Sequence, residues 1–128
     1  MSLPTVAVLC AQLGEHLAPA PGFEAPETEI TAVHVSELAD PTAYLNGGEL
    51  LLTTGMTLPG SLIGCDRYVA ALRETGVVAL GFGVGPSHDR VPEPLTEACR
   101  RQGLPLLLVP PPTPFLTITQ TYWQARTR

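Results

Sequence analysis

The sequence predicts a single α/β domain, built on a mainly parallel sheet of about four to five strands with helices on both faces. Three observations point to this class. Short apolar segments alternate with longer amphipathic ones, which is the order of repeated β-α units. Residues 49–53 carry three consecutive leucines, as expected for a strand buried on both faces. A length of 128 residues fits one domain, and such a chain buries roughly two-thirds of its unfolded surface.

The first part of the chain predicts a helix, a loop and a strand. Apolar residues from Val6 to Leu17 recur at helical spacing, so we expect a helix over 5–17. The proline-rich residues 18–26 indicate a connecting loop. Residues 30–35 are short and β-branched, which is typical of a strand.

A short helix and the leucine-rich strand come next. Asp40 is placed as an N-cap with Pro41 at the first helical position, and this helix is expected to run through Leu45. The dipeptide at 46–47, Asn-Gly, predicts its end. The strand over 49–53 then follows.

The second half repeats the β-α order. Helical spacing begins at Leu62 and ends at Gly76, and strands are expected over 77–82 and 105–109. The helix predicted between these strands, 92–102, has acidic residues early and basic residues late, which suits the helix dipole. From residue 113 onward, apolar residues fit either a helix or an alternating strand, and we favour the helix.

Composition narrows the classes of function. The net charge is −5, and only two of the seven arginines adjoin one another, so the chain lacks the basic surface that nucleic-acid binding requires. The three cysteines are far apart, which argues against a disulfide framework or a zinc site; we expect no metal and no cofactor. The sequence shows no secretory leader and no apolar run of membrane length, so we expect a cytoplasmic protein without membrane contact.

The ends of the predicted strands supply the candidate ligand-binding residues. In a parallel sheet, ligands usually bind beyond the carboxyl ends of the strands. That edge is expected to gather hydroxyl, carboxylate, imidazole and glycine residues. The candidates are Ser36, Glu37, Thr53, Thr54, Gly55, Gly83 and His88. Thr and Gly after a strand are also ordinary turn and capping residues, so a purely structural role remains open.

Glycines lie at the end of the predicted strand 77–82, and a polar segment follows them. The segment GFGVG at 81–85 lacks the order and the following helix of a dinucleotide-binding loop. The polar residues 87–90, Ser-His-Asp-Arg, could close over a small ligand or could form an ordinary solvated loop. Glu37, Glu49 and His88 could in principle meet as acid and base, but no catalytic motif is present, so we predict no catalytic residues.

Three ordered segments carry a resemblance to a known family. They are VHVSELADPTAYLNGGELLLTTG at 33–55, YVAALRETGVVALGFGVG at 68–85 and VPEPLTEACRRQGLPLLLVPPPTPF at 91–115. Together they resemble the N-terminal domain of the purine-catabolism regulator (PucR-like) family. The most specific element is S-E-L followed, after a linker, by G-E-L-L-L-T-T-G. The motif residues carried here are Ser36, Glu37, Leu38, Gly48, Glu49, Thr53, Thr54 and Gly55.

The resemblance implies a sensory domain over 1–128 that belongs to a longer bacterial transcription regulator, with the DNA-binding helix-turn-helix region outside this chain. Members control varied catabolic genes, purine catabolism among them. The leading hypothesis is therefore a non-enzymatic domain that binds a small-molecule effector and acts as a homodimer. An apolar patch of Phe115, Leu116, Tyr122 and Trp123 could supply the contact of the dimer, or these residues could pack the last helix onto the core. One alternative is a ligand-free module for dimerisation and signal relay. A less favoured alternative is a small α/β enzyme acting on a catabolic intermediate.

Overall fold

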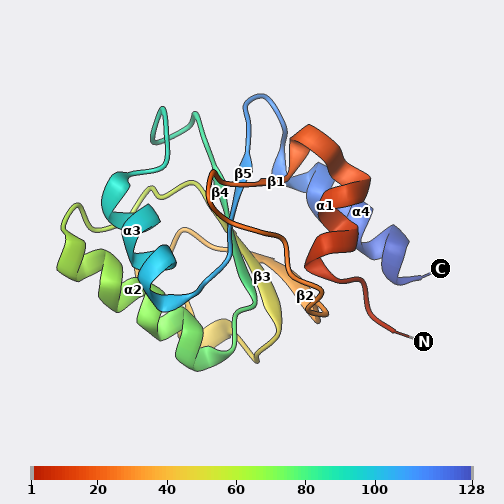
Figure 1. Cartoon of the computed structure of the whole chain (residues 1–128), viewed down its shortest axis with the longest axis horizontal. Coiled ribbons are helices and arrows are strands. Elements are labelled where there is room, and N and C mark those ends of the chain that lie inside the picture. Colours follow the sequence, from red (N-terminus) through yellow and green to blue (C-terminus); the bar gives the residue numbers. More distant parts are fainter. Residues whose placement is uncertain (1, 128) are drawn as a thin grey trace.

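The computed structural model describes residues 2–127 and arranges them in three layers (Figure 1). A central sheet separates two pairs of helices. Helices α1 (Val6–Leu13) and α4 (Phe115–Arg126) cover one face. Helices α2 (Leu62–Thr75) and α3 (Glu93–Gln102) cover the other. This arrangement confirms the predicted α/β class with helices on both faces.

The sheet has five strands, four of which are parallel. The strands are β1 (Ala18–Pro19), β2 (Ala32–Val35), β3 (Glu49–Thr53), β4 (Ala79–Gly83) and β5 (Leu106–Val109). Their order across the sheet is β1-β5-β4-β3-β2, and only β1 runs antiparallel to its neighbour. The carboxyl ends of the four parallel strands therefore lie at one edge, as the sequence predicts.

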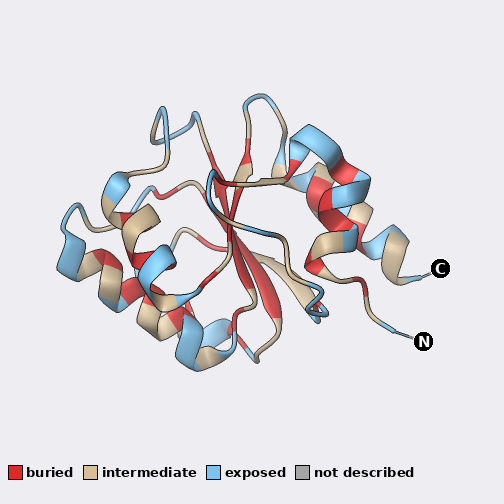
Figure 2. Ribbon diagram, in the orientation of Figure 1, coloured by how far each residue is buried: buried red, intermediate tan, exposed pale blue. Residues whose placement is uncertain are grey.

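The leucines of β3 belong to both halves of the core. Leu51 packs with the side chains of α2 and α3, whereas Leu50 and Leu52 pack with those of α1 and α4. All three leucines are fully buried, and the strands in the middle of Figure 2 are coloured as buried. Alternation along a strand sends neighbouring residues to opposite faces, so an unbroken apolar run is what a strand covered on both sides needs.

Three predicted boundaries in the first half were wrong. Helix α1 ends at Leu13 rather than at residue 17, because Gly14 takes a positive φ of 59° and a 3-10 turn, η1 (Gly14–His16), follows. The supposed loop at 18–26 contains β1, which pairs with β5. The short helix expected to run through Leu45 is only a 3-10 turn, η2 (Thr42–Tyr44).

The chemistry of the residues around η2 explains its length. The predicted N-cap is shifted by one residue: Pro41 is the N-cap of η2, and Asp40 precedes it. The Asp40 Oδ1 accepts hydrogen bonds from the Thr42 amide at 3.1 Å and the Thr42 hydroxyl at 2.6 Å. A few residues on, the buried Glu49 carboxylate accepts from the amides of Asn46, at 2.6 Å, and Gly47, at 2.9 Å. These bonds turn the chain toward β3 before a full helix can form.

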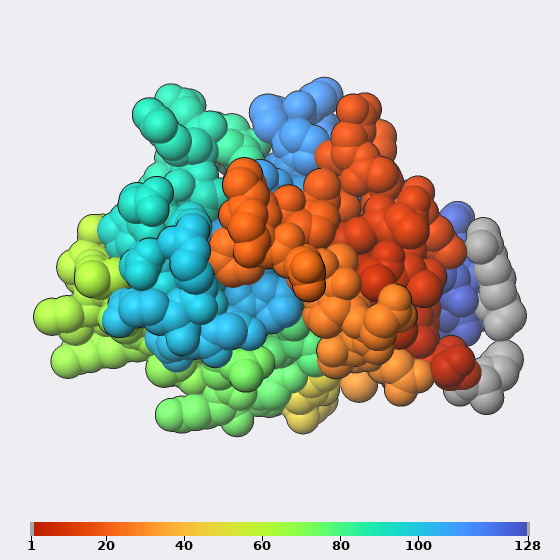
Figure 3. Space-filling view, in the orientation of Figure 1, coloured from red at the N-terminus to blue at the C-terminus, as the bar shows by residue number. Residues whose placement is uncertain are grey.

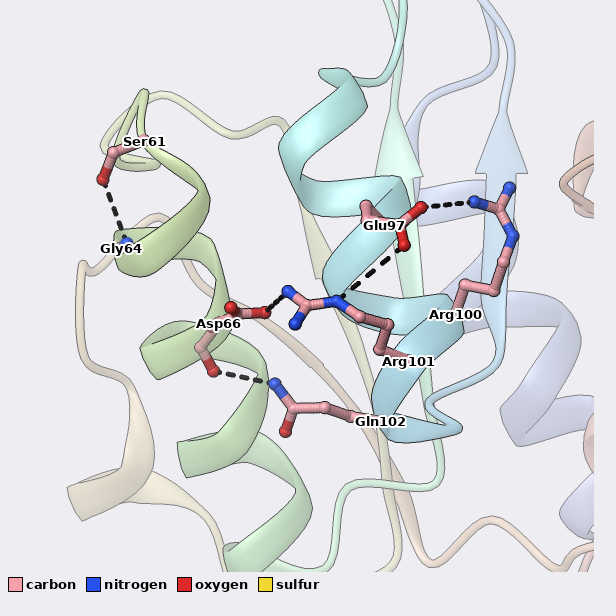
Figure 4. A network of polar contacts seen from close by, with 7 residues as sticks. All are labelled: Ser61, Gly64, Asp66, Glu97, Arg100, Arg101 and Gln102. Atoms are coloured by element: carbon pink, nitrogen blue, oxygen red, sulfur yellow. Dashed lines mark hydrogen bonds and ion pairs between the residues drawn. The ribbon is translucent and has the colours of Figure 1, made fainter.

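The second half follows the predictions more closely. The helix that the sequence favours from residue 113 onward is confirmed as α4, which buries Ile118 and Tyr122 on one face. Polar contacts join α2 to α3 (Figure 4): Arg101 pairs with Asp66, and Gln102 Nε2 donates to the Asp66 carbonyl at 3.0 Å. Helix α2 begins at a genuine cap, where Ser61 Oγ accepts from the Gly64 amide.

Candidate functional site

The candidate site lies at the carboxyl edge of the sheet. The loop after β4 and the loop after β5 project side by side from the top of the view in Figures 1 and 3. The loop between β3 and α2, residues 54–61, completes this edge on the α2 side. The sequence predicts that polar residues from separate strands meet here, and five of the seven candidates are joined by direct contacts.

The Glu37 carboxylate is the centre of these contacts. Its Oε2 accepts hydrogen bonds from the Thr54 amide at 2.7 Å and from the Thr54 hydroxyl at 2.8 Å. Its Oε1 accepts from the Thr53 hydroxyl at 2.9 Å and from the Met56 amide at 3.2 Å. The backbone carbonyl of the same residue accepts from the Thr57 hydroxyl. Glu37 therefore holds residues 53–57, the end of β3 and the first part of the loop that follows it.

This hydrogen-bonding changes the acidity of Glu37. Burial on its own raises the pKa of the carboxyl group, but the hydrogen bonds from Thr54, Met56 and Thr53 favour the ionised form and together lower it below its usual 4.5. The hydroxyl of Tyr68, which lies beside Thr53, has its pKa raised by burial. Glu37 is thus a charged group whose carboxylate is held by neutral donors.

Ser36 and Gly83 shape the edge in other ways. The buried Ser36 hydroxyl accepts from the Leu38 amide at 3.1 Å and so turns the chain after β2. Gly83 lies under the ring of Phe115, the first residue of α4. A Cβ atom at Gly83 would come within 2.8 Å of that ring and 3.5 Å of Thr54. Gly83 has no polar side chain, and the Ser36 hydroxyl is buried in the turn that follows β2.

His88 and Gly55 form the second contact at the edge. His88 Nε2 lies 3.0 Å from the Gly55 carbonyl oxygen, and its ring is tilted against Phe82 with a centroid distance of 5.8 Å. Gly55 has a φ of 75°, and a Cβ there would lie 2.7 Å from Phe82. The hydroxyls of Thr54 and Ser87, 3.4 Å apart, join the same two loops.

A cavity of about 340 Å³ opens between these two loops. Its lining comes from the loop after β3, the loop after β4 and the residue that precedes α3. The lining residues are Leu58, Pro59, Gly60, His88, Asp89, Arg90 and Pro92. Only His88 among the seven predicted candidates lines it.

Sequence reasoning placed Asp89 and Arg90 in the polar loop at 87–90 but missed the wall formed by Leu58, Pro59 and Gly60. Nothing in the composition of residues 58–60 distinguishes a cavity wall from a turn, although the Pro-Gly pair does mark a turn. The predicted site and the observed cavity therefore meet at His88 and lie next to one another.

The structure does not join the three residues that the sequence suggested as acid and base, Glu37, Glu49 and His88. Glu37 and His88 both contact residues 54–56, but no hydrogen bond joins them. Glu49 lies at the opposite, amino end of β3, where it binds backbone amides.

Within residues 2–127, no group of three His, Cys, Asp or Glu side chains is arranged to hold a metal ion. Over the same residues, no helix has both the length and the apolar character that a membrane crossing needs.

Comparison with known proteins identifies the family. A model of the purine catabolism regulatory protein-like family matches residues 8–125. Over 95 residues the chain is 30% identical to the transcriptional activator PmfR of Paenarthrobacter nicotinovorans, a match that covers 74% of this chain and 20% of that protein. The chain thus spans about a fifth of the length of this curated relative. No solved structure gives a significant match. The resemblance found in the sequence is confirmed, and the chain belongs to the purine catabolism regulatory protein-like family.

Proposed function

We propose that this domain senses a small polar metabolite for a bacterial transcription regulator of catabolic genes, without catalysing a reaction. The observation that carries the proposal is the cavity of about 340 Å³ at the carboxyl edge of the sheet. In open α/β sheets this edge is the usual place for a ligand, and cavities of a few hundred Å³ suit small molecules. Membership of a regulator family supports a regulatory role for the domain.

Within this proposal the seven candidate residues take different roles. His88 contacts the effector, because it lines the cavity. Thr54 and Gly55 connect His88 and Ser87 to the end of β3. The remaining candidates, Ser36, Glu37, Thr53 and Gly83, hold the edge in shape through the contacts described above. Binding of the effector in the cavity would then affect all the residues that are hydrogen-bonded along this edge.

The regulator in this proposal is a cytoplasmic homodimer that contacts DNA through regions outside this chain. The net charge of −5 is consistent with a domain that does not itself bind DNA. Among the described residues, no hydrogen bond joins Glu37 to His88, the pair that the enzymatic alternative would use.

A thermal-shift screen tests the proposal. The purified domain would be heated with purine breakdown products, amino acids and other small catabolites. A ligand at 100 times its Kd stabilises a protein by about 2.7 kcal/mol, which is readily detected at this size. The Gly60→Leu variant should lose the response, because Gly60 lines the cavity with open space around its Cβ position.

The matched control for this screen is Gly60→Ala, which adds only a methyl group to the same open position. It should keep the response. A response that survives in Gly60→Leu would place the effector elsewhere, and silence across the screen would remove the support for sensing.

A specific observation favours the ligand-free relay as a second candidate. On α4, Leu116 and Trp123 are 63% and 49% exposed, and they lie two turns apart on one face. Val8 on the neighbouring α1 is 41% exposed. Tyr122, which the sequence placed in the same patch, is instead buried in the core. Self-association that is lost in Trp123→Glu, measured by analytical ultracentrifugation, together with no rise in Tm across the ligand screen, would support this relay over the sensing domain.

A further inference from the structure

The chemistry of the cavity lining narrows the class of effector, and this inference rests on the proposed function. The starting point is which of the two ring nitrogens of His88 carries the hydrogen. A backbone carbonyl oxygen can only accept a hydrogen bond, so the His88 Nε2 that lies 3.0 Å from the Gly55 oxygen must carry the hydrogen. In a neutral imidazole the other nitrogen, Nδ1, is then a bare acceptor.

The orientation of the ring leaves that acceptor available. The Nε2 and Cδ2 atoms face Gly55, since Cδ2 lies 3.1 Å from the position of a Cβ on that glycine. Nδ1 is the ring atom opposite the Nε2–Cδ2 bond, so it points away from Gly55. Among residues 2–127, the Gly55 carbonyl is the only hydrogen-bond partner of the His88 ring. Since His88 lines the cavity, Nδ1 is the acceptor that its ring can offer to an N–H or O–H group of a ligand.

Arg90 and Asp89 supply the charges of the lining. Both are exposed, and neither forms an ion pair with any other residue of the described chain. A guanidinium group is suited to a carboxylate, which it can bind through two parallel hydrogen bonds. The neighbouring Asp89 carboxylate would repel a ligand that is purely anionic, but it accepts hydrogen bonds from a donor group. Leu58, Pro59 and Pro92 complete the lining with apolar surface.

We propose that the cavity binds a small carboxylate that also carries an N–H or O–H donor. The carboxylate would pair with Arg90, and the donor would bind His88 Nδ1 or Asp89. Amino acids, hydroxy acids and cyclic amide acids have this combination; simple fatty acids and neutral amides do not.

A screen in three matched sets of compounds tests the class. The first set holds carboxylates with a donor, such as pyroglutamate and malate. The second holds carboxylates of the same size without a donor, such as N-methylpyroglutamate. The third holds neutral amides of the first set, such as pyroglutamide. Compounds that raise the Tm are then measured by isothermal titration calorimetry.

We expect hits from the first set, with affinity at least roughly tenfold weaker in Arg90→Gln. Arg73→Gln, on the exposed side of α2, is the matched control and should leave the affinity unchanged. In nitrogen NMR of the imidazole at pH 8, His88 should show hydrogen on Nε2, with its Nδ1 signal shifting on binding.

Different failures have different meanings. Hits from the second or third set, or hits that Arg90→Gln does not weaken, overturn the proposed class while the sensing function stands. A His88 ring protonated on Nδ1 overturns it in the same way. No hit in any of the three sets, together with no hit for the wild-type domain in the wider screen, removes the support for the sensing function itself.

Discussion

At the scale of single residues, the motif residue Glu37 connects the chain after β2 to the chain after β3. Its two carboxylate oxygens take four hydrogen bonds from the segment that follows β3. Such bonds to a charged acceptor are stronger than bonds between neutral groups. The S-E-L and T-T-G parts of the motif are thus the two halves of one hydrogen-bonded unit, which explains their joint appearance in the sequence.

The first prediction concerns this carboxylate. Glu37→Gln should lower the free energy of unfolding by about 1–3 kcal/mol at pH 7, because the amide cannot accept all four bonds and places a donor against donors. The pKa of Glu37 is below 4.5 in the folded protein, so its ionised form contributes stability above the unfolded pKa. This contribution is lost as the pH falls through the folded pKa. Urea unfolding at pH 7 and at lower pH measures it.

The control for Glu37→Gln is Glu27→Gln, an exposed carboxylate without a hydrogen bond to the described chain. Its effect should stay within about 0.5 kcal/mol. If the loss in Glu37→Gln were equally large well below pH 4, its cause would be packing and not charge.

The second prediction separates two costs of a side chain at Gly55: the steric clash with Phe82 and the strain of the backbone conformation. Gly55→Ala places a methyl group 2.7 Å from the buried Phe82 ring at a φ of 75°. Gly22→Ala has a similar φ of 85° with open space around it. The control should lose about 1–2 kcal/mol from strain alone, and Gly55→Ala should lose more because Phe82 must move. If chemical denaturation gave equal losses in the free energy of unfolding for the two variants, Phe82 would move away from the added methyl group without a cost in stability.

At the scale of elements, α4 is attached to the sheet by a buried hydroxyl. Tyr122 is fully buried, and its hydroxyl donates to the carbonyl of Ile30, which precedes β2. Arg126 also donates to this hydroxyl, at 3.2 Å. Helix α4, which the sequence favoured over a strand, is therefore held by a contact between residues far apart in the chain.

The third prediction tests this attachment. Tyr122→Phe leaves the buried carbonyl without its donor and should lower the free energy of unfolding by about 1–3 kcal/mol. Tyr44→Phe is the matched control, because Tyr44 is 69% exposed and should change stability by less than about 0.5 kcal/mol. Thermal and urea unfolding of both variants would show the difference. If Tyr122→Phe left the free energy of unfolding unchanged, this would mean that water replaces the lost donor.

The same scale shows what the sequence could and could not predict. Strand β3 was predicted at its observed bounds, since its pattern is local and strong. Strand β1 was missed, because two residues in a proline-rich segment become a strand only by pairing with β5. The edge of the sheet and its polar residues were predictable from the β-α order. The cavity wall at 58–60 was not, because it depends on how a loop folds back beside His88.

At the scale of the whole molecule, the two halves of the core share the strands between them. Neighbouring leucines of β3 belong to opposite halves, so neither layer of helices can leave without exposing a face of the same sheet. A domain of this size usually unfolds in one cooperative transition. The three buried cysteines report on both halves: Cys10 lies in α1, Cys65 in α2 and Cys99 in α3.

The fourth prediction is that all three thiols become reactive in the same step. Burial raises the pKa of Cys10 to about 11 and that of Cys99 to about 12, so neither is a thiolate in the native protein at pH 8. Labelling with a maleimide over a urea series, located by peptide mass spectrometry, should give one midpoint for Cys10, Cys65 and Cys99. An earlier midpoint for Cys10 alone would show that α1 separates from the sheet first, and that the shared strands do not couple the two layers.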